Sequence, residues 1–81
     1  MKGFERKRKR YSSSAEECRD RGLKAGDKIV GNEGYGPTVI QITAIGEEGI
    51  LAKIISRDGK PEIDPRESSW NLKCRDWELV T

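Results

Sequence analysis

The stretch TVIQITAIGEEGILAKIIS, Thr38–Ser56, decides the fold. Its first half alternates between apolar side chains and polar or small ones and is rich in β-branched residues, which is typical of a half-buried strand. GEEG, Gly46–Gly49, interrupts this pattern, and ILAKIIS continues with a second apolar run. Two such runs around a short, glycine-bounded connection are typical of a β-hairpin. We therefore expect antiparallel strands at Thr38–Ile45 and Ile50–Ser56.

Shorter segments on both sides of this hairpin are expected to complete the sheet. GDKIVGN predicts a strand at Asp27–Asn32, followed by a glycine-rich turn that ends at Pro37. The Asp-Gly pair in RDGK, Arg57–Lys60, is typical of a tight turn. PEIDPRES contains two prolines and no periodicity, so a loop is expected there. SWNLK and DWELV predict two final strands, each with a tryptophan and a leucine on one face.

A helix is expected before the sheet, in SSSAEECRDRGL. A serine followed three positions later by a glutamate matches the capping box twice, as Ser13 with Glu16 and as Ser14 with Glu17. Gly22 stands where a helix often ends in a left-handed residue, and the next residue, a leucine, is then expected to contact Cys18. So short a helix is marginal on its own, so it must pack on the rest of the chain.

The positive charge of the chain is concentrated at its N-terminal end. The whole chain of 81 residues carries a net charge of +2, yet residues 1–10 hold six basic side chains against one glutamate. Residues 22–81 hold eight basic and ten acidic side chains, so this part is mildly acidic. A terminal block of like charges is usually solvated, but it is also suited to nucleic-acid phosphates. The candidates for contact with DNA or RNA are Lys2, Arg6, Lys7, Arg8, Lys9 and Arg10.

Short strands, frequent turns and one long loop together predict a mainly β fold, a small five-stranded antiparallel barrel. The opening GDKIV and the closing WELV resemble SH3-like barrels of the KOW and Tudor type. We expect a basic arm at residues 1–12, a short helix at 13–22 and an SH3-like barrel at 23–81. SWNLKCRDWELV, taken with GLKAGDKIVGNEGYGPTVIQITAIGEEG, also resembles small accessory proteins of bacteriophages and prophages. That resemblance, over about Gly22–Val80, implies a phage origin and a binding role.

The sequence contains no recognisable catalytic set. It has no histidine, no GxSxG nucleophile motif and no Walker-type phosphate loop. Cys18 and Cys74 do not have the spacing of a metal site, so we expect two reduced thiols, although a disulfide between them is left open. No apolar run reaches the roughly 18 residues that a membrane span requires, and no secretory signal is recognisable. We expect a cytoplasmic protein, of the host cytoplasm if phage-encoded, without enzymatic activity, cofactor or metal.

Binding is therefore the expected function, and two partners are considered. The first is a host protein that the module modulates or inhibits, and the second is nucleic acid held by the basic arm. A single basic face on the barrel would favour nucleic acid, whereas basic side chains scattered among acidic ones would favour a protein. Homo-oligomerisation is left open. The basic side chains whose arrangement distinguishes a nucleic-acid partner from a protein partner are Lys28, Lys53, Arg57, Lys73 and Arg75.

Two features are candidates for the protein-binding surface. The aromatic residues are the first: Tyr35 lies in a glycine-rich turn and is expected to be exposed, while Trp70 and Trp77 serve mainly in the core. The second is the long mixed-charge loop Arg57–Glu67, in which Ile63 is expected to be tucked against the barrel. The resulting candidates for protein binding are Tyr35, Arg57, Lys60, Arg66 and Trp70.

Overall fold

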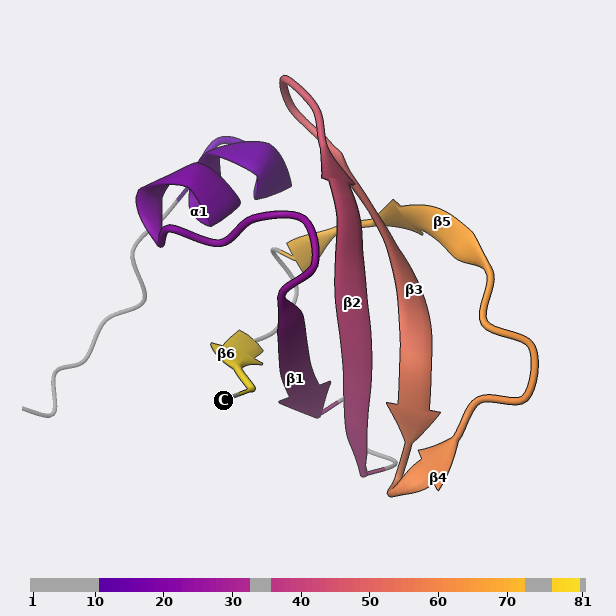
Figure 1. The fold of residues 1–81 in the computed structure, drawn as a ribbon. Coiled ribbons are helices and arrows are strands. Elements are labelled where there is room, and N and C mark those ends of the chain that lie inside the picture. The colour runs from indigo at the N-terminus through magenta and orange to yellow at the C-terminus, as the bar shows by residue number, and fades with distance from the viewer. Residues whose placement is uncertain (1–10, 33–35, 73–76, 81) are drawn as a thin grey trace, which may run out of the picture.

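A computed structural model of the chain describes residues 11–32, 36–72 and 77–80. This part of the chain is mainly β, with one α-helix ahead of an antiparallel sheet of six strands (Figure 1). Of the described residues, no helix has the length and apolar character needed to cross a membrane. The elements are α1 (Ser14–Asp20), β1 (Lys28–Asn32), β2 (Pro37–Ile45), β3 (Ile50–Arg57), β4 (Lys60–Pro61), β5 (Glu67–Trp70) and β6 (Trp77–Leu79).

The sheet is open rather than closed into a barrel. Its strands follow the order β4-β3-β2-β1-β6, and β5 pairs with the same edge of β3 as β4 does. Among the described residues no pairing joins β5 to β6, so the prediction of a closed five-stranded barrel is wrong, although the antiparallel, mainly β class is confirmed. The hairpin strands are confirmed to within one residue at each end.

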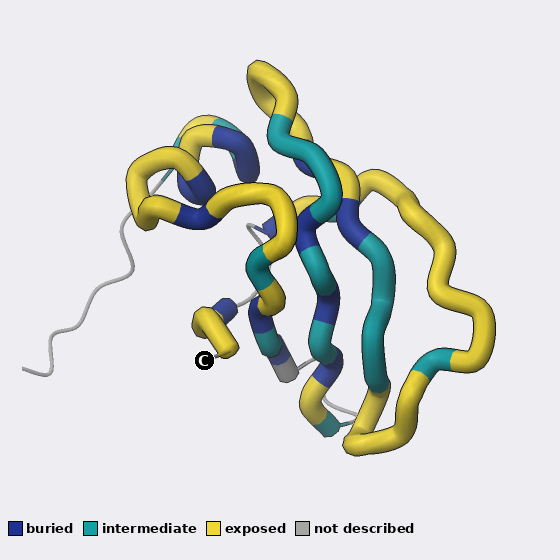
Figure 2. Tube along the Cα trace, in the orientation of Figure 1, coloured by how far each residue is buried: buried dark blue, intermediate teal, exposed yellow. Residues whose placement is uncertain are grey.

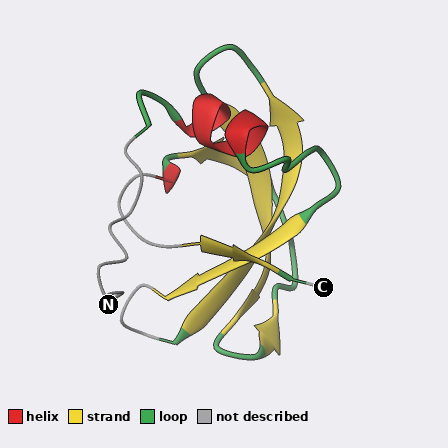
Figure 3. Cartoon of the chain, turned by 90° about the vertical axis from the view of Figure 1, so that its left-hand side faces the viewer, coloured by secondary structure: helices red, strands yellow, loops and turns green. Residues whose placement is uncertain are grey.

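The helix and its C-cap form hydrogen bonds near β5 and β6, the two strands that are not paired with each other among the described residues. The Ser14 hydroxyl accepts a hydrogen bond of 2.9 Å from the Leu72 N–H, just beyond β5. An Arg21 guanidinium N–H donates to the Trp77 carbonyl in β6 at 2.7 Å. Buried backbone polar groups need partners, and here two of them are satisfied by side chains of α1 and its C-cap instead of by strand pairing. Figure 3 shows α1 beside the upper end of the curved sheet.

The helix starts as its sequence predicts. Ser13 is the N-cap, and its side chain accepts a hydrogen bond of 3.1 Å from the Glu16 N–H. The Glu16 carboxylate accepts bonds from the N–H and the hydroxyl of Ser12, at 2.7 and 2.6 Å, so the reciprocal half of the capping box falls one residue earlier than its usual place. The hydrogen bonds from the Ser12 hydroxyl and N–H lower the pKa of Glu16.

Removing this cap should weaken the fold by a modest amount. We expect Ser13→Ala to lower the free energy of unfolding by about 1 kcal/mol, because the Glu16 N–H loses its partner. Urea denaturation followed by circular dichroism measures the change. Ser13→Asp keeps a capping oxygen and should stay near the parent value. Equal losses in the two variants would contradict the role of the cap.

The end of the helix also matches its prediction. Gly22 has φ +73°, and the Leu23 N–H donates to the Cys18 carbonyl at 2.8 Å, which is the hydrogen bond of a Schellman motif. Leu23 and Cys18 both belong to the buried core. Cys18 is a free cysteine, and burial raises the pKa of its thiol. Cys74 lies outside the described residues.

The helix is held against the tip of the β2–β3 hairpin by backbone acceptors. The Arg19 guanidinium donates to the carbonyls of Gly46 and Glu47 at 2.9 and 3.0 Å, and the Ala15 N–H donates to the Glu48 carbonyl at 3.0 Å. The two glutamate residues at the tip, Glu47 and Glu48, are exposed. Three otherwise unpaired carbonyls of the tip are thereby used to orient α1.

The core lies between α1 and the sheet, as the buried segments in Figure 2 show. Trp77 is only 3% exposed and meets Trp70 edge-to-face, with ring centroids 6.0 Å apart and an interplanar angle of 87°. Edge-to-face pairs are a favoured aromatic geometry. The core consists of Ala15, Cys18, Leu23, Ile29, Ile40, Ile42, Ile50, Ala52, Leu72 and Trp77.

The segment after β3 differs from its prediction. Asp58 and Gly59 have φ of 53° and 81°, which agrees with the expected tight Asp-Gly turn. The turn leads directly into β4, and β5 begins at Glu67, so PEIDPRES is a loop only in its middle. Proline does not prevent this pairing, because Pro61 lies in a two-residue strand at the edge of the sheet, where a missing N–H is tolerated.

Candidate functional site

The loop between β4 and β5, Glu62–Arg66, encloses a hollow at the edge of the sheet. The Glu62 N–H still bonds the Ile55 carbonyl of β3 at 2.9 Å, after which the chain swings away from β3 and returns at β5 (Figure 1). The hollow between this loop and β3 measures about 410 Å³. We call it the edge pocket, and it is lined by Ile54, Arg57, Glu62, Asp64, Arg66 and Ser68.

The edge pocket combines an apolar floor with charges of both signs. Ile54 is half-buried and packs against the core, so it offers apolar surface. Arg66 bonds one Asp64 carboxylate oxygen through two nitrogens, at 3.0 and 3.1 Å, and this exposed pair contributes little to stability. The side chains of Arg57 and Glu62, in contrast, form no hydrogen bond or ion pair with any described residue.

Ile63, at the middle of the loop, is 96% exposed. The prediction that it packs against the sheet is wrong, because the loop stands away from β3 between Glu62 and Glu67 and carries Ile63 with it. An isoleucine gains roughly 1.5–3 kcal/mol when it is fully buried, and none of this is realised within the described fold. Single exposed apolar residues are common on protein surfaces, but Ile63 is far more exposed than Leu51, Leu79 and Val80, which are 39%, 47% and 41% exposed. Sequence reasoning missed this exposure.

A sequence signal for this exposure does exist. Ile63 stands between two carboxylates, and prolines lie two positions away on both sides, at Pro61 and Pro65. Proline restricts the backbone and lacks an N–H, so neither a helix nor a regular strand can hold the isoleucine against the core here. The pattern PEIDP therefore indicates a stiff connection, but it does not show how far the Ile63 side chain stands from the sheet.

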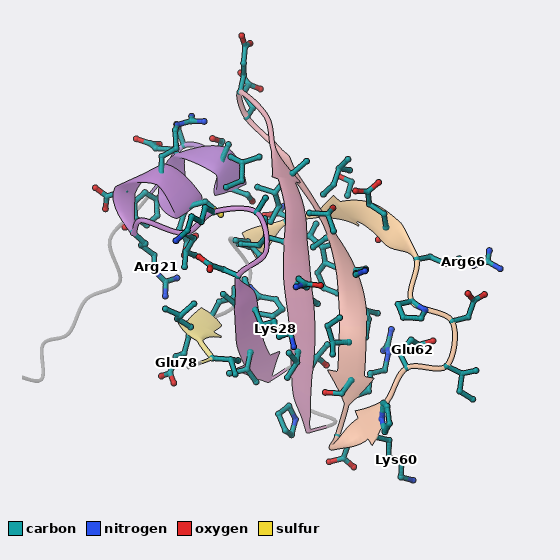
Figure 4. All side chains as sticks on the ribbon, in the orientation of Figure 1. Arg21, Lys28, Lys60, Glu62, Arg66 and Glu78 are labelled. Carbon is teal, nitrogen blue, oxygen red and sulfur yellow. The ribbon has the colours of Figure 1, made fainter. Side chains whose placement is uncertain are left out.

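The described residues among the predicted protein-binding set do not all lie at one site. Arg57 and Arg66 both line the edge pocket, and Lys60 is exposed in β4, opposite Arg57 in the strand register. Figure 4 shows Lys60, Glu62 and Arg66 on the same side of the molecule. Trp70 is half-buried against Trp77 and lines a different hollow, next to the start of α1. Outside the described residues lie Tyr35 and the basic set Lys2, Arg6, Lys7, Arg8, Lys9 and Arg10.

The described basic side chains of the sheet are interleaved with acidic or polar ones. Lys28 and Lys53 share a row across the sheet, with Gln41 between them and Glu67 next to Lys53. Arg57 lies further along β3 in the edge pocket, together with two carboxylates. Lys73 and Arg75 fall outside the described residues. The basic side chains of the described part of the sheet are therefore mixed with acidic and polar ones and do not form a single basic face.

A metal-binding role has no support in the described ranges. No group of three or more histidine, cysteine, aspartate or glutamate side chains is placed there to hold a metal ion.

Comparison with known proteins places the chain in a family. A family model, described as a domain of unknown function (DUF7241), matches residues 12–81. No curated protein and no solved structure matches the chain. The match takes in α1, the six strands and the edge pocket, and it begins after the basic run of residues 6–10. The chain therefore belongs to the DUF7241 family, a domain of unknown function.

Proposed function

We propose that the protein is a non-enzymatic binding module that holds a partner protein through the β4–β5 loop and the edge pocket. The observation that carries this proposal is the 96% exposure of Ile63 on the loop that also frames the pocket. Protein interfaces typically depend on a few anchor side chains that become fully desolvated, surrounded by polar groups that set orientation. Ile63 supplies such an anchor, and the charged lining of the pocket supplies the surrounding groups.

The loop has properties that reduce the cost of binding. Pro61 and Pro65 restrict the backbone on both sides of Ile63, so less conformational freedom is lost when the loop is immobilised. Charges of both signs beside the anchor favour a partner with a complementary pattern and disfavour others. In the setting implied by the resemblance to phage accessory proteins, that partner is a host protein whose activity the module modulates or inhibits.

We further infer that the sheet is an opened relative of the SH3-like barrel. Support comes from the β1–β2–β3 meander and from the return of the last strand to pair with β1. SH3-like barrels often bind ligands through aromatic residues at one rim, and we infer that the β4–β5 loop, at the edge of β3, takes over this role here. The sheet differs from a closed SH3-like barrel in that, among the described residues, β5 and β6 are not paired with each other.

Site-specific photo-crosslinking tests the binding function. A photoreactive amino acid at Ser68, which is exposed and lines the edge pocket, should give a discrete protein adduct in the cells where the protein occurs. The same group at Lys24, which is exposed in the connection between α1 and β1, serves as the control and should give none. Nuclease treatment before irradiation should leave the adduct unchanged. Equal labelling from both positions, or an adduct lost with nuclease, would contradict the proposal.

Attachment to nucleic acid through Lys2 and Arg6–Arg10 stays a prediction of the sequence. The six basic side chains favour it, since each phosphate contact releases counterions. We regard it as the second candidate, since residues 22–81 are net acidic and the family match begins after the basic run. Charge alone attaches a protein to nucleic acid without reading its sequence, so this arm would assist the binding site on the sheet instead of replacing it.

A further inference from the structure

We propose that the edge pocket receives an extended peptide segment of the partner that carries an apolar side chain together with one acidic and one basic side chain. This inference rests on the proposed function above and names the chemistry of its ligand. The occupant is a segment of another protein whose chemistry is defined by the charges, the apolar floor and the size of the pocket.

The charges of the pocket are not equivalent. Asp64 and Arg66 satisfy one another, at 3.0 Å. The side chains of Arg57 and Glu62 line the same pocket without an ion pair or hydrogen bond to any described residue. A ligand therefore has one cation, Arg57, and one anion, Glu62, to complement. A ligand with a single charge would pair with one of these side chains and leave the other without a partner. Charge complementarity of this kind mainly determines which partner is accepted.

The floor and the size of the pocket define the rest of the ligand. Ile54 is the apolar residue of the lining, and it is partly buried against the core, so an apolar side chain placed on it would extend the core outward. A volume of about 410 Å³ falls within the range of pockets that hold a small ligand, roughly 300–1,000 Å³, and is enough for one large side chain with its flanking backbone. A peptide with an apolar residue near an acid and a base meets all of these conditions.

A second hollow shows why these charges matter. The hollow near the tip of the β2–β3 hairpin, about 250 Å³, is lined by Ala44, Ile45, Gly46, Gly49, Ile50, Leu51 and Ser69. None of these side chains is charged, so an occupant would gain apolar contact but no preferred direction. The edge pocket can determine both the identity and the direction of a bound segment.

Selection from a random peptide library tests this chemistry. Peptides displayed on yeast are sorted for binding to the labelled full-length protein, and the affinities of selected peptides are measured for four variants. We expect selected peptides to carry an apolar residue with an acid and a base close by. We expect Arg57→Gln and Glu62→Gln each to weaken binding between about twofold and fivefold. The matched controls Lys24→Gln and Glu47→Gln change exposed charges outside the pocket and should leave affinity unchanged.

Double-mutant cycles then assign each contact. Once the acidic residue of the peptide is replaced by its amide, Arg57→Gln should cause no further loss of affinity. Likewise, once the basic residue of the peptide is replaced by glutamine, Glu62→Gln should cause no further loss of affinity. Selected peptides that lack one of the charges, pocket variants that behave like the controls, or failure to enrich any sequence would each overturn the inference. A specific cross-link from Ser68 would in those cases still support the proposed function, so the two can fail separately.

Discussion

Replacing Ile63 by aspartate is expected to reduce the yield of the Ser68 cross-link at least tenfold while the free energy of unfolding changes by no more than about 0.5 kcal/mol. The substitution should affect cross-linking much more than stability, because the Ile63 side chain is 96% exposed. Its loss removes nothing from the core, but an interface anchor of this size typically contributes about 2 kcal/mol or more, and a carboxylate in its place would be buried at further cost. Adduct yield and urea denaturation measure the two quantities.

Two further variants identify the cause of the loss. Ile63→Leu retains a similar apolar volume and should retain most of the adduct. Val80→Asp introduces the same charge at a residue that is 41% exposed beyond β6, and it should leave the adduct unchanged. An Ile63→Asp variant that still cross-links like its parent would show that the loop is not the binding element.

Substituting Gly31 by alanine is expected to lower the free energy of unfolding by about 2 kcal/mol. Gly31 lies opposite Trp77 in the pairing of β1 with β6. A Cβ atom at Gly31 would lie 2.8 Å from Trp77 Cε3 and 3.0 Å from Cδ2 and Cζ3, closer than such atoms approach in proteins. The indole cannot move aside cheaply, because it is buried and packs edge-to-face against Trp70. Denaturation followed by tryptophan fluorescence measures the loss.

The hairpin offers a matched control for this substitution. At Gly49 a Cβ atom would meet nothing within 4 Å, so Gly49→Ala should change the free energy of unfolding by no more than about 0.5 kcal/mol. A Trp77→Leu background provides the second check. Because the smaller side chain leaves room for a methyl group, Gly31→Ala should cost less there than in the parent protein. Equal costs in both backgrounds would show that contact with the indole is not the cause.

The elements that the sequence predicted well are those governed by interactions between near neighbours. The alternation over Thr38–Ile45 is confirmed as β2, the Asp-Gly pair forms its tight turn, and both ends of α1 follow their capping signals. Each of these depends on residues within about one turn or one strand of each other. Local preferences and hydrophobic periodicity are therefore sufficient to predict them.

The candidate site was predicted in part. Arg57 and Arg66 were expected at the binding surface because they lie in a long mixed-charge loop, and both line the edge pocket. Ile63 was expected against the sheet, because apolar residues are usually buried and the sequence does not show how far a loop stands from its neighbours. The short strand β4 was missed since two paired residues produce no periodicity.

The sequence by itself determined that this protein has a mainly β domain with a capped helix ahead of it, and that its positive charge is concentrated at the N-terminal end. Only the tertiary structure decided which residues meet across long distances in the chain. In the structure Trp77 packs against Gly31, and Arg21 forms a hydrogen bond with β6. The sheet is not closed among the described residues, and Ile63 is exposed beside the edge pocket. These outcomes depend on packing between separate segments, and packing is a property of the whole fold that no local pattern encodes.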